Sequence, residues 1–315
     1  MLKKILYSNK FKDRKEYGES YYRNNEHDEN QYINLLKDIL EEGSLEKGRN
    51  GNTKSIFGSV MHFSLKDNKV PILTTKKTAW KTCLKELLWF IKGETDNKIL
   101  NKQNVHIWDG NSSKEFMESR GLGGYKEGDL GPIYGFQWRN FNAEYGTCDD
   151  NYKNKGVDQL KEVIETLKNP ELRTSRRMIV SAWNPCQLND MALPPCHVMF
   201  QFNVMEGNKL SCSMYQRSVD CPLGSPFNIA SYSILTHIIA KHCELEAYEF
   251  IYYMGNAHIY EEHLSEMEEQ VKREPYEFPK INIKSKRENI DDYVLEDFEI
   301  LDYKHHPSIK MKMVA

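Results

Sequence analysis

The chain has 315 residues, of which 39% are apolar and 28% charged, enough to bury a sizeable core in one large domain or two ordinary ones. Its net charge of −3 lacks the basic excess that nucleic-acid binding normally needs, so any phosphate recognition should be local. RNA binding stays open, but nothing in the composition indicates it. No apolar run is long enough to predict a membrane span, and the charged start does not resemble a signal peptide.

The seven cysteines are odd in number and widely spaced, and no CxxC pair or HExxH pattern accompanies them. This spacing favours reduced thiols over a disulfide framework. We therefore expect a reducing, cytoplasmic location and no metal site, zinc included.

The first 28 residues are polar and aperiodic, which predicts a tail or linker that contributes little to a core. From Asn30 apolar residues recur at helical spacing, and Gly43 marks the end of that helix. We expect residues 29–315 to form the folded domain.

Further elements alternate along the rest of the chain. Helices are predicted at Trp80 to Lys92, Val157 to Lys168 and Ser225 to Cys243. The last is apolar on nearly every side and carries Pro226 in its first turn, so it should be a buried central helix. Runs rich in β-branched and aromatic residues predict strands at 178–183, 197–204, 209–216 and 248–254. The mixture of helices and strands favours a single α+β domain.

Glycine-rich phosphate-binding loops are missing from the sequence.

A candidate nucleophile lies in the run Leu193-Pro-Pro-Cys-His197, where two prolines fix the approach to Cys196 just before a strand. The alternative is an inert, buried cysteine. His197 need not contact the sulfur, because neighbours on a strand point to opposite faces.

A candidate anion site follows the strand at 209–216. Arg217 offers a planar fork for phosphate, Ser218 a hydroxyl, and Asp220 a carboxylate that can accept from a heterocycle. The alternative is a surface salt bridge between Arg217 and Asp220. Arg176 and Arg177 form a second basic pair, which is otherwise a solvated patch.

Polar residues inside apolar helices are a third signal. Asn228 lies in the predicted central helix, where an amide needs partners and could bind the polar edge of a uracil, unless backbone groups satisfy it. Glu86 lies among leucines, so burial should raise its pKa and suit it to proton transfer; otherwise it pairs with Lys85 or solvent. His258 and Tyr260 share a strand face and could bind a sugar hydroxyl or form a polar rim.

Taken together, these segments resemble the thymidylate synthase family, in its eukaryotic form and in the protist form where the domain follows a dihydrofolate reductase. The resemblance runs from about Gln31 to Ala315. The matching motifs are ELLWF (86–90), IWDGN (107–111), GDLGPIYGFQW (128–138), SRR (175–177), MALPPCH (191–197), QRSVD (216–220), LGSPFNIASY (223–232) and HIY (258–260).

The resemblance implies an α+β fold with a mixed sheet, packed helices and a homodimer joined sheet to sheet. It implies that Cys196 adds to C6 of deoxyuridine monophosphate (dUMP), after which C5 attacks the methylene of 5,10-methylenetetrahydrofolate. Glu86 and Tyr134 would manage proton transfers, and hydride from the folate would complete the methyl group. The products would be thymidylate and dihydrofolate.

The same resemblance assigns binding roles. Arg217, Ser218 and Arg49 would hold the phosphate, joined by Arg176 and Arg177 from the partner subunit. Asn228 would bind the pyrimidine, His258 and Tyr260 the 3′-hydroxyl, while Gln216 and His197 support the site. Residues expected to contact the folate are Ile107, Trp108, Asp220, Leu223, Gly224 and Phe227, with the C-terminal residues through Ala315 closing as a lid.

The sequence departs from the family pattern at three places: the shortened loop Arg49-Asn-Gly-Asn-Thr53, the pair Cys221-Pro222, and Ser225 in place of a larger aliphatic residue.

Two other functions are alternatives to dUMP methylation. A pyrimidine hydroxymethylase would share the fold and use water in place of hydride; Asn228 and Trp108 favour dUMP methylation over it. A non-catalytic dimer that binds nucleotides or RNA as a regulator would draw support from the altered loop and Pro222.

Overall fold

A six-stranded sheet with strand order β1-β2-β6-β5-β4-β3 forms the frame of the structure, a computed structural model that describes residues 27–48 and 51–312. Strands β5 and β6 are parallel, and the other pairs are antiparallel, so the sheet is mixed. The predicted α+β class is confirmed. The strands are β1 Ser44–Gly48, β2 Gly51–Ser64, β3 Ile179–Ser181, β4 His197–Met205, β5 Lys209–Asp220 and β6 Glu246–Tyr260, and a separate hairpin pairs β7 Lys280–Ile283 with β8 Phe298–Leu301.

The helices fall close to the predicted positions where a prediction existed. The apolar spacing from Asn30 gives a helix that ends before Gly43, and the later predictions correspond to α3, α8 and α9. The helices are α2 Asn30–Glu42, α3 Trp80–Ile91, α4 Asn97–Asn101, α5 Asp109–Ser112, α6 Lys114–Ser119, α7 Tyr134–Asn140, α8 Gln159–Lys168, α9 Gly224–His242 and α10 Leu264–Gln270. None of the helices in the described part of the chain is long and apolar enough to cross a membrane.

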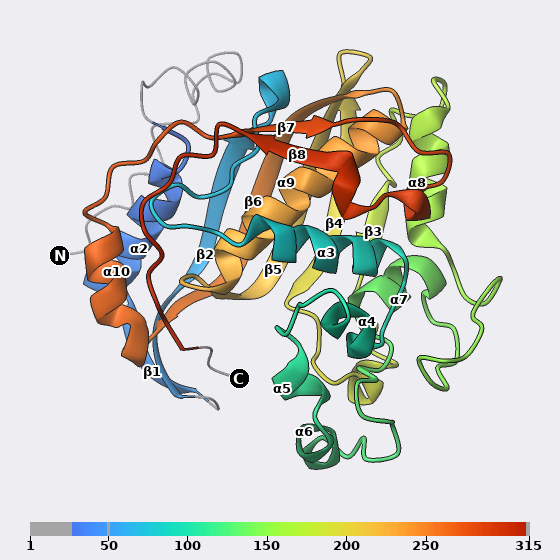
Figure 1. Cartoon of the computed structure of the whole chain (residues 1–315), viewed down its shortest axis with the longest axis horizontal. Coiled ribbons are helices and arrows are strands. Elements are labelled where there is room, and N and C mark those ends of the chain that lie inside the picture. The colour runs from blue at the N-terminus through green and yellow to red at the C-terminus, as the bar shows by residue number, and fades with distance from the viewer. Residues whose placement is uncertain (1–26, 49–50, 313–315) are drawn as a thin grey trace.

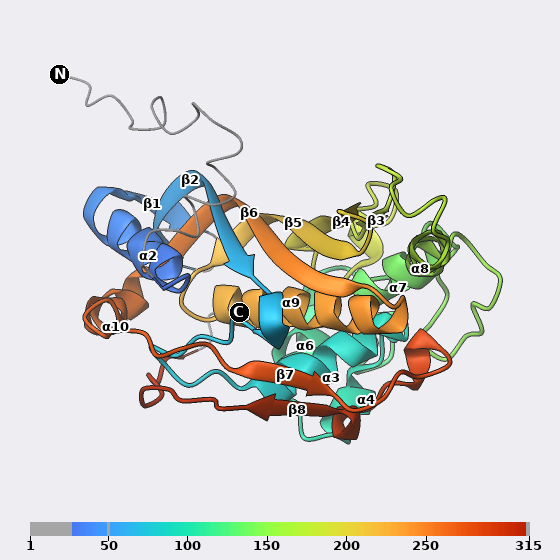
Figure 2. The ribbon, with the colours of Figure 1, turned by 90° about the horizontal axis from the view of Figure 1, so that it is seen from above.

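Helix α9 is the central layer between the sheet and α3, as Figures 1 and 2 show. It connects the parallel strands β5 and β6, so its first turn lies where β5 ends. Most of its side chains are buried, as predicted. The exceptions near its start are Gly224, Phe227 and Asn228, which share one helix face because they are spaced by three and four residues. That face is only partly covered by the rest of the fold.

In Figure 2 none of the helices of the described residues covers the other face of the sheet. Large apolar side chains of the sheet strands are exposed. Val60, Tyr253 and Tyr215 are register neighbours on β2, β6 and β5, so they point to the same side. Their exposed fractions are 38%, 47% and 40%, and Phe57 on β2 is 82% exposed. A contiguous apolar surface of this kind is typical of a protein–protein interface.

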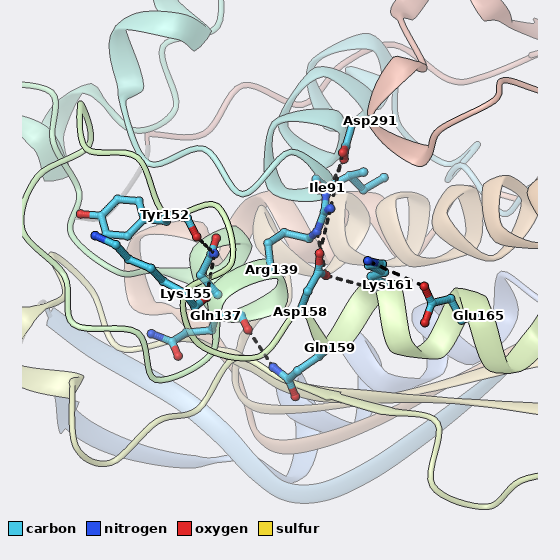
Figure 3. Close-up of polar contacts among 11 residues, drawn as sticks. Ile91, Gln137, Arg139, Tyr152, Lys155, Asp158, Gln159, Lys161, Glu165 and Asp291 are labelled. Atoms are coloured by element: carbon cyan, nitrogen blue, oxygen red, sulfur yellow. Dashed lines mark hydrogen bonds and ion pairs between the residues drawn. The ribbon is translucent and has the colours of Figure 1, made fainter.

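Arg139 fixes helix α7, whose first residue is Tyr134 (Figure 3). Its guanidinium donates to both oxygens of Asp158, at 2.9 and 3.0 Å, and to the carbonyl of Ile91 at 2.6 Å. It also pairs with Asp291. The side chain is 16% exposed, so one partly buried cation joins α7 to the end of α3, the start of α8 and the 290–292 turn.

Both ends of the described chain converge on Thr74 and Thr75. The carboxylate of Glu29, which is completely buried, accepts hydrogen bonds from the backbone N–H and hydroxyl of both threonines. The backbone N–H of His306 donates to the Thr74 carbonyl at 2.7 Å. Residues 1–26 of the predicted tail lie outside the described residues, and the division at residue 28 remains a prediction.

Candidate active site

Cys196 lies directly before β4, on the proline-rich loop that the sequence indicated. Arg217 on β5 holds this loop, donating from Nε to the Pro195 carbonyl at 2.8 Å and from Nη2 to the Pro194 carbonyl at 2.9 Å. The same Nη2 lies 4.0 Å from the sulfur of Cys196. Burial raises the pKa of the Cys196 thiol, and the Arg217 cation opposes that rise. The arrangement supplies a positioned thiol beside a fixed positive charge.

Arg217 itself is held from two further sides. Its guanidinium carbon lies 5.4 Å from the centre of the Trp183 ring, within the range of a cation–π contact. Gly255 on β6 allows the close approach of the two strands, because a Cβ there would lie 2.6 Å from the Arg217 carbonyl oxygen. The contacts with the proline loop, with Trp183 and with β6 thus hold the Arg217 side chain in one position.

Tyr134 and His197 form a stacked pair beside the cysteine. The Tyr134 hydroxyl accepts a hydrogen bond from the backbone N–H of Cys196 at 2.8 Å, and its ring stacks on His197 with centroids 4.1 Å apart. His197 Nδ1 forms a 2.8 Å hydrogen bond with the Tyr232 hydroxyl. Burial lowers the pKa of His197 to about 3, so this histidine is neutral near pH 7. It positions its neighbours and does not supply a positive charge.

Glu86 on α3 points to the same region. The indole Nε1 of Trp108 donates to its carboxylate oxygen at 2.7 Å, and the Trp108 and Tyr134 rings lie 6.1 Å apart. Burial raises the pKa of Glu86 to about 7, opposed by the bond from Trp108. The expected rise in pKa is therefore present, and the alternative pairing with Lys85 is not, since Lys85 donates to the Gln103 carbonyl. A carboxyl group of this kind can exchange protons near neutral pH.

Asp220 and Asn228 lie on either side of Gly224. A Cβ at Gly224 would lie 3.5 Å from Asp220 Cβ and 3.8 Å from Asn228 Oδ1, so the glycine leaves this space open. Asp220 accepts from the backbone N–H of Leu223 at 3.0 Å, and burial raises its pKa. Neither it nor Arg217 forms the salt bridge considered as an alternative; Arg217 contacts the proline carbonyls instead.

Two expectations for this region are wrong in detail. Asn228 is only partly buried, because it lies on the open face of α9, and no hydrogen bond joins its amide to the other described residues. Residues 216–220 do not follow a strand but complete β5, which extends to Asp220. The sequence did not predict this extension, because residues 217–220 are mostly polar and show no apolar alternation. They are part of the strand because they pair with β6.

Polar side chains on β5 and β6 complete the candidate site. The buried Gln216 accepts from the Tyr252 hydroxyl at 2.7 Å and donates to the Ser218 carbonyl at 3.0 Å. His258 lies opposite Asp220 in the strand register, and its Nδ1 hydrogen bonds to Asn256 Oδ1 at 3.0 Å. Burial lowers the pKa of His258. The Tyr260 ring lies edge-on to it with centroids 5.2 Å apart, on the same face, as the spacing predicted.

Comparison with known proteins places this geometry in a family. The family model described as thymidylate synthase matches residues 30–315. The chain belongs to the thymidylate synthase family. It is 50% identical over 297 residues to the thymidylate synthase of Saccharomyces cerevisiae, covering 91% of this chain and 97% of that protein.

Two bifunctional relatives are longer than this chain. It is 49% identical over 292 residues to the bifunctional dihydrofolate reductase-thymidylate synthase of Leishmania major, covering 92% of this chain and 56% of that protein. The corresponding protein of Paramecium tetraurelia is 49% identical over 299 residues, which are 94% of this chain and 63% of that protein. The chain thus spans a little over half the length of these relatives.

Some residues predicted for the thymidylate synthase site are not described by the structure or are not in contact with the rest of the site. Arg49 and Ala315 lie outside the described residues. Arg176 and Arg177 are exposed ahead of β3, and within the described residues neither guanidinium forms an ion pair. Ile107, Leu223 and Phe227 are partly exposed. Within residues 27–48 and 51–312, no group of three His, Cys, Asp or Glu side chains is arranged to hold a metal ion.

The departures at Cys221, Pro222 and Ser225 lie where β5 leads into α9. All three residues are buried, and the Pro222 carbonyl accepts a hydrogen bond from Lys76. Burial lowers the pKa of Lys76 to about 8. These residues therefore contribute to the packing beneath the turn between β5 and α9 rather than to its surface.

Sequence reasoning missed the residues that support the site from behind. Trp183 covers Arg217, Tyr232 holds His197, and Tyr252 holds Gln216. The tyrosines are at most 2% exposed, and a buried phenol needs a partner for its hydroxyl. A tyrosine at a predicted core position therefore indicates that its hydroxyl has a hydrogen-bond partner, although the sequence does not show which residue that partner is.

Proposed function

We propose that the chain methylates dUMP to thymidylate, using 5,10-methylenetetrahydrofolate as cosubstrate and yielding dihydrofolate. The observation that carries this proposal is the convergence of a positioned thiol, a fixed guanidinium and a carboxyl group titrating near pH 7 around one open helix face. Membership of the thymidylate synthase family supports the same activity.

In the proposed reaction the Cys196 thiolate attacks C6 of the uracil. The electron pair of the C5–C6 double bond then makes C5 a nucleophile toward the methylene carbon. The Arg217 cation favours the thiolate, because a nearby positive charge lowers the free energy of the ionised sulfur. Tyr134, which contacts the Cys196 backbone, keeps the nucleophile in place.

Glu86 is proposed to receive and return protons, including the one lost from C5. Its pKa of about 7 allows both the acid and the base form to be present near neutral pH. The Trp108 N–H stabilises the ionised form. Loss of the C5 proton breaks the bond between the methylene carbon and the folate nitrogen. Hydride from the released tetrahydrofolate then reduces the methylene to the methyl group as the Cys196 sulfur leaves C6, which yields dihydrofolate and thymidylate.

Substrate recognition is proposed to follow the polarity of the cleft. The unpartnered amide of Asn228 would bind the pyrimidine edge, His258 and Tyr260 the 3′-hydroxyl, and Arg217 and Ser218 the phosphate together with Arg49. Gln216 and His197 would support these contacts. Residues proposed to face the folate are Ile107, Trp108, Asp220, Leu223, Gly224, Phe227 and Ala315.

We also propose that two copies associate through the open sheet face. The exposed side chains of Phe57, Val60, Tyr215 and Tyr253 make that face apolar, and one face meeting its copy is the usual geometry of a symmetric dimer. The adjacent, unpaired guanidinium groups at 176 and 177 would then reach the partner's phosphate site. Sedimentation should give twice the 37.0 kDa chain mass.

The free cysteines fit a cytoplasmic location.

The decisive experiment follows tritium released from C5-labelled dUMP alongside dihydrofolate formation. We expect folate-dependent release matched one to one by dihydrofolate. Release without dihydrofolate would identify a hydroxymethylase, and no release would favour a nucleotide-binding regulator.

A variant separates binding from chemistry. Cys196→Ser should bind dUMP with unchanged affinity, measured by calorimetry, and lose turnover by at least about a thousandfold, because the hydroxyl is a far weaker nucleophile. Cys186→Ser, at an exposed cysteine, is the matched control and should keep full activity. Near-normal turnover of Cys196→Ser would exclude Cys196 as the nucleophile.

A further inference from the structure

Ile107 and Trp108 lie on a short turn whose two flanking side chains contact each other. His106 Nδ1 lies 2.9 Å from Asp109 Oδ2, and the backbone N–H of Asp109 donates to the His106 carbonyl at 3.3 Å. A carboxylate oxygen only accepts, so Nδ1 carries a proton and donates it. The 106–109 turn is therefore closed by a side-chain contact as well as by a backbone one.

The second carboxylate oxygen of Asp109 joins this turn to helix α4. Its Oδ1 atom accepts from the side-chain amides of Asn97 at 2.8 Å and Asn101 at 2.7 Å. These asparagines are four residues apart in α4, so they lie on the same face of the helix. The carboxylate of Asp109 thus accepts from the turn on one side and from α4 on the other.

Asn97 also holds the backbone of Trp108 from the following residues. Its Nδ2 donates to Ser112 Oγ at 3.0 Å, and the backbone N–H of Ser112 donates to the Trp108 carbonyl at 3.0 Å. Asn97 and Ser112 are 2% and 3% exposed. An amide nitrogen carries two hydrogens, so Asn97 can donate to Asp109 and to Ser112 at the same time. One buried amide therefore holds Trp108 through two of its neighbours.

The position of the Trp108 ring decides whether its indole reaches Glu86. The Nε1 atom donates to the Glu86 carboxylate at 2.7 Å. A displacement of about 0.5 Å along this bond would bring it to the upper end of the range for N–H···O hydrogen bonds, where the interaction weakens. The contact between Trp108 and Glu86 therefore depends on how firmly the 106–109 turn is held.

We propose that Asp109 is a positioning residue, which ties the 106–109 turn to α4 and so keeps the Trp108 N–H on the Glu86 carboxylate. The same tie fixes Ile107 and Trp108 where they are proposed to face the folate, and this part of the inference rests on the proposed function. Asp109 itself contacts no substrate. It acts through the turn and the indole of Trp108.

Two substitutions at Asp109 test this role without any measurement of activity. Alanine removes every acceptor, whereas asparagine keeps an oxygen that can accept from Asn97 and Asn101. The readout is the carbon-13 NMR titration of the Glu86 carboxyl group, identified by its absence in Glu86→Gln. The Trp108 N–H lowers the pKa of Glu86 against the rise caused by burial, so loss of that contact raises the pKa.

We expect the pKa of Glu86 to rise by about 0.5 unit in Asp109→Ala and to stay within about 0.1 unit of wild type in Asp109→Asn. Removing a negative charge would by itself lower the pKa of Glu86, so a rise has the sign that only the weakened contact with Trp108 gives. An unchanged titration in Asp109→Ala would overturn the proposal. Equal rises in the two variants would overturn the role of the α4 amides.

Steady-state kinetics tests the part that concerns the folate. Asp109→Ala should raise the KM for methylenetetrahydrofolate about threefold, because a displaced turn loses part of its contact with that ligand. The KM for dUMP should change little, since most of the proposed nucleotide contacts lie between Gln216 and Tyr260. An unchanged folate KM would overturn this part. An inactive wild type whose Glu86 titration still responds to Asp109→Ala would refute the proposed function and leave the positioning role supported.

Asp150 offers a matched control. Its side chain is exposed, and its Oδ2 accepts from the backbone N–H and the hydroxyl of Thr147, at 2.8 and 3.2 Å. Asp150→Ala should leave both the Glu86 titration and the folate KM unchanged. A similar rise in the pKa of Glu86 for this variant would overturn the proposal, because the effect would then not depend on release of the 106–109 turn.

Discussion

Replacing Glu86 with glutamine should make the protein more stable at pH 8 while removing its activity. Burial moves the pKa of Glu86 from 4.5 to about 7, so the folded state binds this proton more tightly than the unfolded state does. The stability gained from that proton is fully present below pH 4.5 and is lost as the pH rises through 7. At 1.36 kcal/mol per pKa unit the loss reaches about 3 kcal/mol, and the neutral amide of glutamine does not undergo it.

Urea unfolding of wild type and Glu86→Gln at pH 4 and pH 8 measures this effect. We expect free energies of unfolding within about 0.5 kcal/mol of each other at pH 4 and a variant about 3 kcal/mol more stable at pH 8. Glu165→Gln is the control, because Glu165 is 64% exposed and its ion pair with Lys161 is weak. A stability difference between Glu86→Gln and wild type that is the same at both pH values would refute the reasoning. Tritium release by Glu86→Gln should be lost at either pH.

Two further substitutions test the supports of the site. Trp108→Phe removes the N–H that stabilises the Glu86 carboxylate, so the pKa of Glu86 should rise by about 1 unit. The rise should appear in the carbon-13 NMR titration of that carboxyl group and in the acidic limb of the pH–rate profile. An unchanged titration would contradict this. Arg139→Met should lower the free energy of unfolding by about 3 kcal/mol, because it leaves Asp158 and Asp291 without their cation. Lys161→Met, at an exposed pair, should change it by less than about 0.5 kcal/mol, and equal losses for the two variants would disprove the role of Arg139.

The elements that could be predicted from sequence are those with local signals. Helix α9 is apolar on nearly every side, and its burial follows from that alone. The loop at Cys196 is marked by its prolines, and the raised pKa of Glu86 follows from the leucines around it. In each case the residues that decide the outcome lie within a few positions of one another.

Features that depend on distant partners could not be predicted in this way. Strand β2 was missed, because its glycines and polar residues break the apolar alternation and its Phe57 is 82% exposed. The partner of Glu86 is Trp108, and nothing in the spacing of the two residues indicates their hydrogen bond. Asn228 was expected to be buried, since the sequence shows an apolar helix but not which face the rest of the fold leaves uncovered.

The crossover from β5 through α9 to β6 has a consequence for how the cleft forms. Most residues proposed to bind the nucleotide lie between Gln216 and Tyr260, within a single stretch of chain. Contacts within one stretch of chain cost less loop-closure entropy than contacts between distant segments, so we expect this part of the site to assemble early. Of the residues proposed to face the folate, Asp220, Leu223, Gly224 and Phe227 lie in the same stretch, whereas Ile107 and Trp108 lie more than a hundred residues before it. The contacts that Ile107 and Trp108 make with this stretch are therefore expected to open more readily than the contacts within it.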